Sequence, residues 1–493
     1  MYLLTVSKKW KQLSLCIFLG ITFFLIPAPG DLAPAGWHVF GIFAATIVGL
    51  ILKPLPMGAV ALLSLTVLCL THTLELEEAL SGFSNSTIWL IVTAFFISRG
   101  IIKTGLGERI AYLFVERFGK RTLFLAYSLI ASDVLMAPAM PSNTARAGGI
   151  LAPIVKSLDL AFDSDPEKGT EDRLGRFLVP AIFHTDLVIS AIFLTSMAAN
   201  PMAVSFAGSV AGVQMTWGGW LAASCVPGIL SLLLYPLVIY RIDPPELKET
   251  PEAPTLAREK LDAMGPLKRE EKVMGLIFLL LIALWSGGRY LGISETLTAF
   301  IGLCLLLLTG VLSWEDVKSE KGAWDTLIWF AILVMMANQL NAKGMIPWFS
   351  QEMAGLVAGT NGLAAMVVLG LVYFYSHYLF ASSTAHVSAM YAAFLTVMAS
   401  AGAPPAMAAY ILAWFSSLFC CLTHYGSGPA PIFFGAGYVS QNRWWGIGFL
   451  LSLLSLLIWG GLGSLWGNAY TYVEKAEDDL TPKTKENITL EEL

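Results

Sequence analysis

The sequence predicts an all-α polytopic membrane protein with about 11 transmembrane helices and two re-entrant hairpins, arranged as an inverted repeat. Of the 493 residues, 56% are hydrophobic and 13% are charged, whereas soluble proteins carry about 25% charged residues. A soluble fold cannot bury so much apolar surface, and the length accommodates roughly a dozen helices of ~20 residues. The composition therefore excludes a nucleic-acid-binding protein, a secreted disulfide scaffold and a soluble enzyme.

The six cysteines lie in apolar stretches and lack the CxxC spacing of metal sites. They are Cys16, Cys69, Cys225, Cys304, Cys420 and Cys421. Each is expected to be a small core residue. The sequence therefore predicts no metal ion, no cofactor and no disulfide framework.

The N-terminus is expected in the cytoplasm, because Lys8, Lys9 and Lys11 precede an apolar run that has no cleavage site. Apolar segments are predicted at residues 12–28, 36–52 and 56–72, separated by turns rich in proline and glycine. A fourth segment begins near Thr87 and continues to the basic cluster at 117–121. This cluster places the end of the fourth segment in the cytoplasm.

Residues 122–157 are too many for one span, yet basic residues flank both ends of this segment. Both ends should therefore lie in the cytoplasm. Pro138 and Pro141 break the helix near its middle, which predicts an inward-opening re-entrant hairpin. The alternative is two short full spans joined by an uncharged outer turn.

The middle of the chain contains a broken helix and one sizeable polar loop. Residues 177–240 lack Lys and Arg, which fits one long helix broken near 198–201 and a second helix at 217–240. The loop 241–272 has seven Lys and Arg residues and is expected in the cytoplasm. Helices are predicted next at 273–291, 295–313 and 324–343.

Residues 344–442 contain no Lys or Arg and include a second long apolar segment, 362–401. A hairpin without flanking positive charge should open to the outside. The last span is expected at 444–468, which places the C-terminus outside. The acidic tail that follows is expected to be solvated and dispensable for the fold.

Two halves of the chain share four landmarks in the same order. These are similar stretches beginning at Thr87 and Thr326, glycines at Gly105 and Gly344, the motifs 142–144 and 382–384, and helix breaks at 195–201 and 423–429. The first two pairs are offset by 239 residues and the motifs by 240. Chance similarity between apolar helices would explain any one landmark, but not their shared order. Because the two hairpins should open in opposite directions, the repeat is predicted to be inverted, as in secondary transporters.

The two hairpin tips are predicted to form an anion site. Backbone N–H groups at a helix start are unpaired and carry about half a positive charge, and nearby hydroxyls and amides can donate to carboxylate oxygens. The candidate substrate-binding residues are Ser142, Asn143, Thr144, Ser382, Ser383 and Thr384, with Thr195 and Thr423 at the helix breaks. The alternative role of the tip residues is to cap the half-helices.

A basic or titratable side chain follows each leading serine by four residues: Arg146 follows Ser142, and His386 follows Ser382. Both are candidate substrate-binding residues, because ionisable groups within a membrane are rare and usually functional. The alternative for Arg146 is a structural ion pair with Asp133. For His386 the alternative is a hydrogen-bonded position in the core.

A substrate with two carboxylates needs compensating charge in a medium of low dielectric. Sodium ions can supply this charge and leave with the substrate, but a covalently attached Arg146 or His386 cannot leave. The empty site would then stay positive and cross the membrane poorly. We therefore expect an obligatory exchange of one anion for another.

At these residues the chain resembles the divalent anion:sodium symporter superfamily, in particular its exchanger branch of 2-oxoglutarate/malate translocators and bacterial citrate/succinate and tartrate/succinate antiporters. The resemblance covers about 10–470. It is carried by Pro-Ser-Asn-Thr-Ala-Arg at 141–146, His-Tyr-Leu-Phe-Ala-Ser at 377–382 with Ala385-His386, and Gly-Pro with Gly-Ala-Gly-Tyr at 428–438.

The resemblance implies a homodimer of the elevator type in the bacterial inner (plasma) membrane, with substrate contacts at the two tips and near Thr423. The division it implies is scaffold helices at 1–80, a first transport part at 81–216, scaffold helices at 217–320, a second transport part at 321–443, a last helix at 444–470 and the tail at 471–493. Ser383 stands where the sodium-coupled members usually have asparagine. This departure weakens a sodium site there and fits the exchangers better.

The sequence thus predicts a sodium-independent exchanger of di-/tricarboxylates of the malate, 2-oxoglutarate, succinate and citrate class. Its expected partners are these anions and the lipid bilayer, without nucleic acid. The first alternative is a sodium-coupled symporter of the same fold. An anion channel would not need a site repeated in opposite orientation, and an intramembrane enzyme would need a motif such as HExxH or GxSxG, which does not occur.

Overall fold

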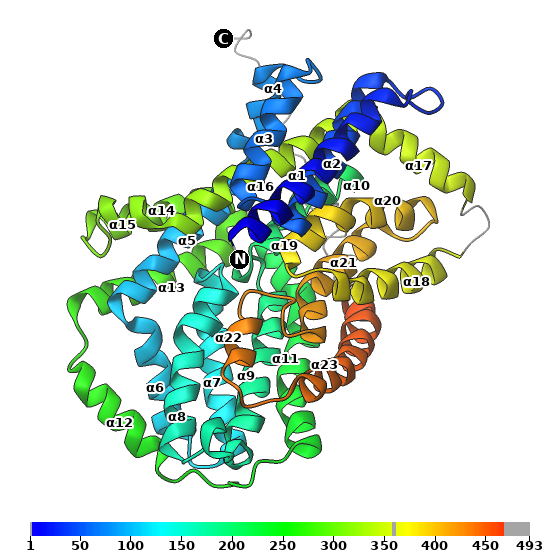
Figure 1. The fold of residues 1–493 in the computed structure, drawn as a ribbon. Helices are drawn as coiled ribbons and strands as arrows, with labels where there is room; N and C mark the ends of the chain where they lie inside the picture. The colour runs from blue at the N-terminus through cyan, green and yellow to red at the C-terminus, as the bar shows by residue number, and fades with distance from the viewer. Residues whose placement is uncertain (1, 357–360, 468–493) are drawn as a thin grey trace.

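The computed structural model describes residues 2–356 and 361–467, and all regular secondary structure in these ranges is helical (Figure 1). One isolated β-bridge joins Arg121 to Glu249. The predicted all-α fold is therefore confirmed. The tail at 471–493 and the last residues of the predicted helix 444–470 lie outside the described residues.

Ten helical segments of the described chain are long and apolar enough to cross a membrane, so the protein is a multi-pass membrane protein. They are α2 (Pro34–Leu52), α5 (Ser86–Thr104), α7 with η2 (Thr122–Ala139), α9 (Gly175–Ile192), α11 (Trp217–Ile242), α13 (Arg269–Leu291), α16 (Lys321–Ala342), α18 with η7 (Gly362–Leu379), α21 with η9 (Pro405–Leu422), and α23 (Gln441–Ser455) with η10 (Leu456–Gly463). The other α-helices are α1 (Tyr2–Leu25), α3 (Met57–Leu70), α4 (Leu76–Leu80), α6 (Leu106–Phe118), α8 (Ala152–Ala161), α10 (Ala199–Ala211), α12 (Ala253–Met264), α14 (Glu295–Leu308), α15 (Trp314–Ser319), α17 (Met345–Leu356), α19 (Ser383–His386), α20 (Ala392–Ser400) and α22 (Ala430–Gly435).

The helices α1, α2 and α3 pack in sequence, and α2 and α3 also pack on α16. Buried hydroxyls join α2 to α3, since Thr46 Oγ1 donates to Ser64 Oγ at 2.6 Å. Gln12 Nε2 of α1 donates to the carbonyl of Leu52 at the end of α2, at 3.0 Å. These bonds hold the C-terminal end of α2 against its neighbours.

The first predicted hairpin is interrupted where its prolines stand. Helix α7 continues into the turn η2 (Ala137–Ala139), and helical structure resumes at Thr144 with η3 (Thr144–Leu151), which leads into α8. Proline has no backbone N–H and clashes with the preceding helical turn, so Pro138 and Pro141 end α7 here. The break predicted at this position is present.

The start of this first segment and the loop that follows α8 are hydrogen-bonded to the same piece of chain. The N–H of Thr122, at the start of α7, donates to the carbonyl of Lys248 at 3.1 Å. The N–H of Leu247 donates to the carbonyl of Arg173, shortly after α8, at 3.0 Å. The chain therefore returns after the break to the end of the molecule from which it started.

The second predicted hairpin has the same construction. Helix α18 continues into η7 (Ser376–Leu379), and after a break α19 leads into η8 (Val387–Tyr391) and α20. Its ends also meet, because a Cβ added at Gly362 would lie 2.5 Å from the backbone of Gly402. Ser350 Oγ of the preceding helix and Ser400 Oγ of α20 are 2.8 Å apart.

A broken helix follows each hairpin. Helix α9 ends at Ile192, and the turn η6 (Leu194–Ser196) separates it from α10, so the break lies slightly before the predicted 198–201. The corresponding break after α21 and η9 begins at Thr423 and ends at α22. The windows of α9 and α21 are 94% and 83% buried, and Ser417 Oγ of α21 donates to the carbonyl of Leu187 at 2.7 Å. These two helices form the centre of the molecule.

Two glycines at equivalent positions of the repeat end helices, which the sequence analysis does not predict. The fourth segment was predicted to continue from Thr87 to 117–121, but Gly105, with φ of +77°, divides it into α5 and α6. Gly344, with φ of +83°, divides α16 from α17 in the same way. A left-handed residue ends a helix, and glycine adopts this conformation without the strain of a Cβ. The glycines that recur in the two halves of the chain are therefore equivalent helix ends.

Helix α23 provides a test of the packing beside the second break. A Cβ at Gly448 would lie 2.0 Å from the carbonyl oxygen of Cys421, whereas a Cβ at Gly446 meets nothing within 4 Å. We expect Gly448→Ala to lower the thermal unfolding midpoint in detergent, because the backbone of η9 must move, at a cost of about 1–3 kcal/mol. Gly446→Ala should leave the midpoint unchanged or raise it slightly, because alanine favours a helix. Equal midpoints for the two variants would contradict this packing.

Candidate functional site

The first tip presents Ser142, Asn143 and Thr144 at the start of a helical segment. Ser142 Oγ accepts a hydrogen bond from the N–H of Ala145 at 3.1 Å, so Ser142 caps this helical start. The capping role does not remove the Ser142 hydroxyl proton, which remains available as a donor. The amide of Asn143 lies 4.0 Å from the sulfur of Met197 in the first helix break.

The second tip repeats this arrangement. Ser382 Oγ accepts from the N–H of Ala385 at 3.4 Å and lies 2.9 Å from Thr384 Oγ1. The chain reaches Ser382 in extended conformation and becomes helical at Ser383, where α19 begins. Both tips therefore end in a short hydroxyl-rich sequence at the start of a helix, as the sequence predicts.

The structure brings the two tips to one cavity of about 430 Å³. All six tip residues line it. The other lining residues are Lys53, Phe95, Pro141, Met197, Ala198, Ala381, Tyr425, Ser427, Gly428 and Pro431. The cavity thus combines both tips, both helix breaks and the end of α2, with no carboxylate among these described residues.

The predicted residues of the helix breaks lie behind the cavity and do not line it. Thr195 Oγ1 donates to the carbonyl of Pro138 at 2.5 Å and accepts from Trp217 Nε1 at 3.1 Å, so it joins the first break to the first tip. Thr423 Oγ1 is buried and has no hydrogen-bond partner among the described residues. Thr195 therefore acts through the tip, and Thr423 lies next to Gly426 of the second break.

Three lining residues with polar side chains were absent from the predicted set: Lys53, Tyr425 and Ser427. Ser427 belongs to the helix break predicted at 423–429, so the sequence indicates its place near the site. Its hydroxyl is buried and lacks a hydrogen-bond partner in the described structure, which makes it an available donor. Tyr425 is held in place because its hydroxyl donates to the carbonyl of Tyr378 at 2.9 Å.

Arg146 is fully buried, and all five of its N–H donors have partners. Nε donates to Asp133 Oδ1 at 2.5 Å, and Nη2 donates to Asp186 Oδ1 at 2.6 Å. The remaining bonds run to the carbonyls of Met140 and Ser196 and to the hydroxyl of Ser190. The guanidinium therefore joins the first tip to α7, α9 and the first break.

The structure thus places Arg146 in the ion pair with Asp133 that was its alternative role, and adds Asp186 as a second partner. Arg146 is not among the residues that line the cavity. Because two carboxylates face one guanidinium, this group supplies no surplus positive charge to a bound anion. A role of Arg146 in binding substrate stays a prediction, and in this structure its donors bind protein groups.

His386 also lies in its alternative position, a hydrogen-bonded place in the core. Its ring stacks on Phe380 with centroids 4.4 Å apart, and its Nδ1 lies 3.0 Å from His377 Nδ1. Its Nε2 lies 3.2 Å from Ser376 Oγ, so both ring nitrogens have partners. His377 Nε2 in turn donates to the carbonyl of Gly426 at 2.9 Å. This histidine pair joins the second tip to the second break, as Arg146 joins the first.

Gly428 brings the second break into contact with the first tip. A Cβ at this position would lie 1.9 Å from Thr144 Oγ1. A side chain at this position would have to displace Thr144 or the second break, which are far apart in the sequence. The halves of the chain therefore meet directly at the cavity.

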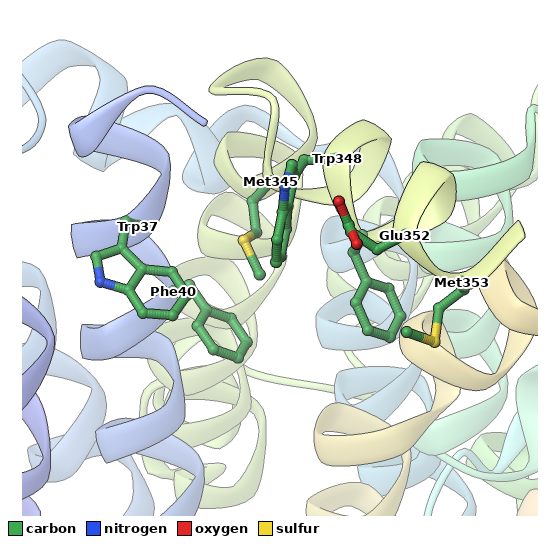
Figure 2. Close-up of a pocket in the computed structure, with 7 residues that line it drawn as sticks. Trp37, Phe40, Met345, Trp348, Glu352 and Met353 are labelled. Carbon is green, nitrogen blue, oxygen red and sulfur yellow. The ribbon is translucent and has the colours of Figure 1, made fainter. Parts of the chain in front are cut away.

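A second cavity, shown in Figure 2, has different chemistry. Trp37 and Phe40 of α2 face Met345 and Trp348 of α17 across it, and its charged lining residue is Glu352. A carboxylate repels anions, and the indole N–H of Trp37 already donates to the carbonyl of Ile26 at 3.0 Å. The cavity between the tips, which has hydroxyl and amide donors and no carboxylate among its described lining residues, is the better candidate for an anion site.

These features define a multi-pass, all-helical membrane protein with a polar cavity between two interrupted helical segments. Residues 7–473 match the family model described as "Sodium:sulfate symporter transmembrane region", and the chain belongs to this family. The family resemblance seen in the sequence is therefore confirmed.

The relatives are named as transporters. The chain is 56% identical over 460 residues to "Putative malate transporter YflS" of Bacillus subtilis, covering 93% of this chain and 96% of that protein. It is 48% identical over 462 residues to the chloroplastic dicarboxylate transporter 1 of Spinacia oleracea, covering 93% and 81%. Its fold is similar to the crystal structure of the Alcanivorax borkumensis YdaH transporter, with a TM-score of 0.57, 11% identity, and coverage of 94% and 97% of the two chains.

The Arg146 network predicts a difference between two substitutions. Arg146→Gln leaves two buried carboxylates without a counter-charge, so we expect about 3–5 kcal/mol of lost stability and a much lower unfolding midpoint in detergent. Asp186→Asn should be far milder, because Arg146 keeps Asp133 and the new amide oxygen still accepts from Nη2. A stable Arg146→Gln protein with weakened dicarboxylate binding would instead return Arg146 to the substrate.

The close approach at Gly428 predicts loss of binding without general unfolding. In Gly428→Ala the new Cβ displaces Thr144 or the second break, so we expect dicarboxylate affinity to fall by about tenfold or more, equivalent to ~1.4 kcal/mol. The control is Gly435→Ala in the adjacent α22, where a Cβ meets nothing within 4 Å. Equilibrium binding of radiolabelled malate to purified protein measures both variants. Wild-type affinity in Gly428→Ala would show that the two segments do not constrain the site.

Proposed function

We propose that this protein is a secondary active transporter that exchanges di-/tricarboxylates across the membrane by obligatory antiport, independently of sodium. One observation carries the proposal: both hydroxyl-rich tips line a single cavity that has no carboxylate among its described lining residues. Names of relatives support the substrate class, since they include dicarboxylate and malate transporters. The same names favour a transporter over an enzyme.

The substrate sits between the tips in this proposal. The hydroxyls of Thr144 and Ser383 and the amide of Asn143 donate to its carboxylate oxygens, and Ser427 adds a buried donor. The backbone N–H groups at the starts of the two helical segments add partial positive charge. Such donors act together on an anion that lies within the cavity, and each is strengthened by low dielectric.

Both interrupted segments act as re-entrant hairpins in this proposal, the first opening inward and the second outward. The hydrogen bonds of Thr122 and of residues 172–173, in the loop after α8, to residues 246–248 support this topology. The contact of Gly362 with Gly402 supports it for the second segment. The proposal also places the protein in a bacterial inner membrane as a homodimer, with the N-terminus in the cytoplasm and the C-terminus outside.

Independence from sodium follows from the donors that the tips offer. Ser383 supplies a hydroxyl where Asn143 of the first tip supplies an amide carbonyl, so the second tip has one fewer strong oxygen ligand for a sodium ion. The partial charges of the helix starts are fixed in the protein. Without a mobile cation to neutralise them, the empty site stays electropositive and returns poorly, which couples the entry of one anion to the exit of another.

Reconstituted protein tests the exchange. We expect proteoliposomes loaded with unlabelled malate to take up labelled malate at the same rate in sodium and in choline, and empty vesicles to take up at least about tenfold less, because return of the unloaded site limits the cycle. Accumulation of dicarboxylate in empty vesicles under a sodium gradient would establish the alternative, a sodium-coupled symporter. Uptake that does not saturate would indicate a channel.

A further inference from the structure

We propose that Lys53 is a substrate-binding residue that pairs with one carboxylate of a dianion and makes the site select dianions over monoanions of the same shape. This inference rests on the proposed function and concerns how the same site recognises the charge of its substrate. Lys53 is the one charged side chain among the described residues that line the cavity between the tips. The remaining polar lining groups are uncharged.

The charge of Lys53 is available to a ligand. None of the ion pairs between described residues includes Lys53, whereas Arg146 is saturated by Asp133 and Asp186. The hydroxyls of the tips bind any carboxylate by donating hydrogen bonds, so they contribute little discrimination by charge. A second carboxylate therefore needs a full cation in reach, and Lys53 is the cation that the cavity provides.

The backbone at Lys53 also points to a specific use of this side chain. Helix α2 ends here with Lys53 in the left-handed conformation, at φ 53° and ψ 49°, and its N–H donates to the carbonyl of Gly49 at 2.9 Å. Glycine is the usual residue at such a helix end because other residues are strained there. Only two other non-glycine residues of the described chain, His72 and Asp163, have positive φ. Strained backbone of this kind clusters at functional sites, where the function of the side chain offsets its cost in stability.

Helix α2 contacts the second tip directly, because it packs on α19 and η8. A lysine side chain that extends from this helix end therefore reaches a ligand held between the tips. The alternative role of Lys53 is to supply a positive charge that fixes the orientation of α2 in the membrane. If Lys53 binds the ligand, removing its charge should weaken the binding of a dianion more than that of a monoanion. If Lys53 only orients α2, the two ligands should be affected equally.

The test compares succinate with succinamate, its half-amide, which has the same length and one fewer negative charge. Equilibrium binding of each compound to purified protein in detergent is measured for the parent, Lys53→Gln, Lys53→Arg and Lys120→Gln. Lys120 is the matched control, since it is an exposed lysine at the end of α6 that does not line the cavity. The unfolding midpoint of each variant is measured alongside.

We expect Lys53→Gln to weaken succinate binding about tenfold and succinamate binding less than about threefold, with an unchanged unfolding midpoint. Lys53→Arg should restore most of the succinate affinity, and Lys120→Gln should bind both compounds as the parent does. Equal losses for the two compounds, or no loss for succinate, would overturn the proposal, as would a parent protein that binds neither compound. A protein that loses succinate affinity selectively in Lys53→Gln but does not exchange malate would support the role of Lys53 and refute the proposed antiport. The two proposals can therefore fail separately.

Discussion

The buried guanidinium of Arg146 determines the shape of the first tip, and the site depends on it. Its five donors connect Asp133 of α7, Asp186 and Ser190 of α9, the carbonyl of Met140 in the tip and the carbonyl of Ser196 in the helix break. A broken helix leaves carbonyl groups without partners inside an apolar interior, where each unsatisfied group is costly. One planar group with five donors satisfies two of these carbonyls and two carboxylates at once. The interruption that creates the site is thereby made stable.

The second tip solves the same problem with neutral groups. His386 and His377 lie side by side, and His377 donates to the carbonyl of Gly426 in the second break. The residues four positions after Ser142 and Ser382 thus have equivalent structural tasks in the two halves, and neither faces the cavity. The buried charge of Arg146 is thus separate from Lys53, the charge that lines the cavity. The tips are therefore supported by groups behind them, and their own hydroxyls line the cavity.

The architecture of the tips could be predicted from the sequence, because proline breaks, hydroxyl-rich motifs and repeated spacing are local signals. The broken helices and the shared cavity of Ser142 and Ser382 followed from the same signals. The second partner of Arg146 and the position of Lys53 at the cavity could not be predicted in this way. Asp186 lies 40 positions from Arg146, and only the packing of α9 on α7 brings them together. Lys53 stands in a proline-rich turn about 90 positions before the first tip, where nothing in the sequence indicates a shared cavity.

The hydrogen bonds also show which parts of the site belong together. Arg146 and Thr195 bind the first tip to its break, the histidine pair binds the second tip to its break, and Gly428 packs directly on Thr144. Helix α2 is instead bonded to α1 and α3, and no hydrogen bond joins it to either tip within the described chain. A boundary without polar bonds costs little to slide, so we propose that the tips and breaks form one unit that moves relative to Lys53. In an elevator-type cycle the lysine would then hold the dianion in the arrangement seen here and release it as that unit moves away.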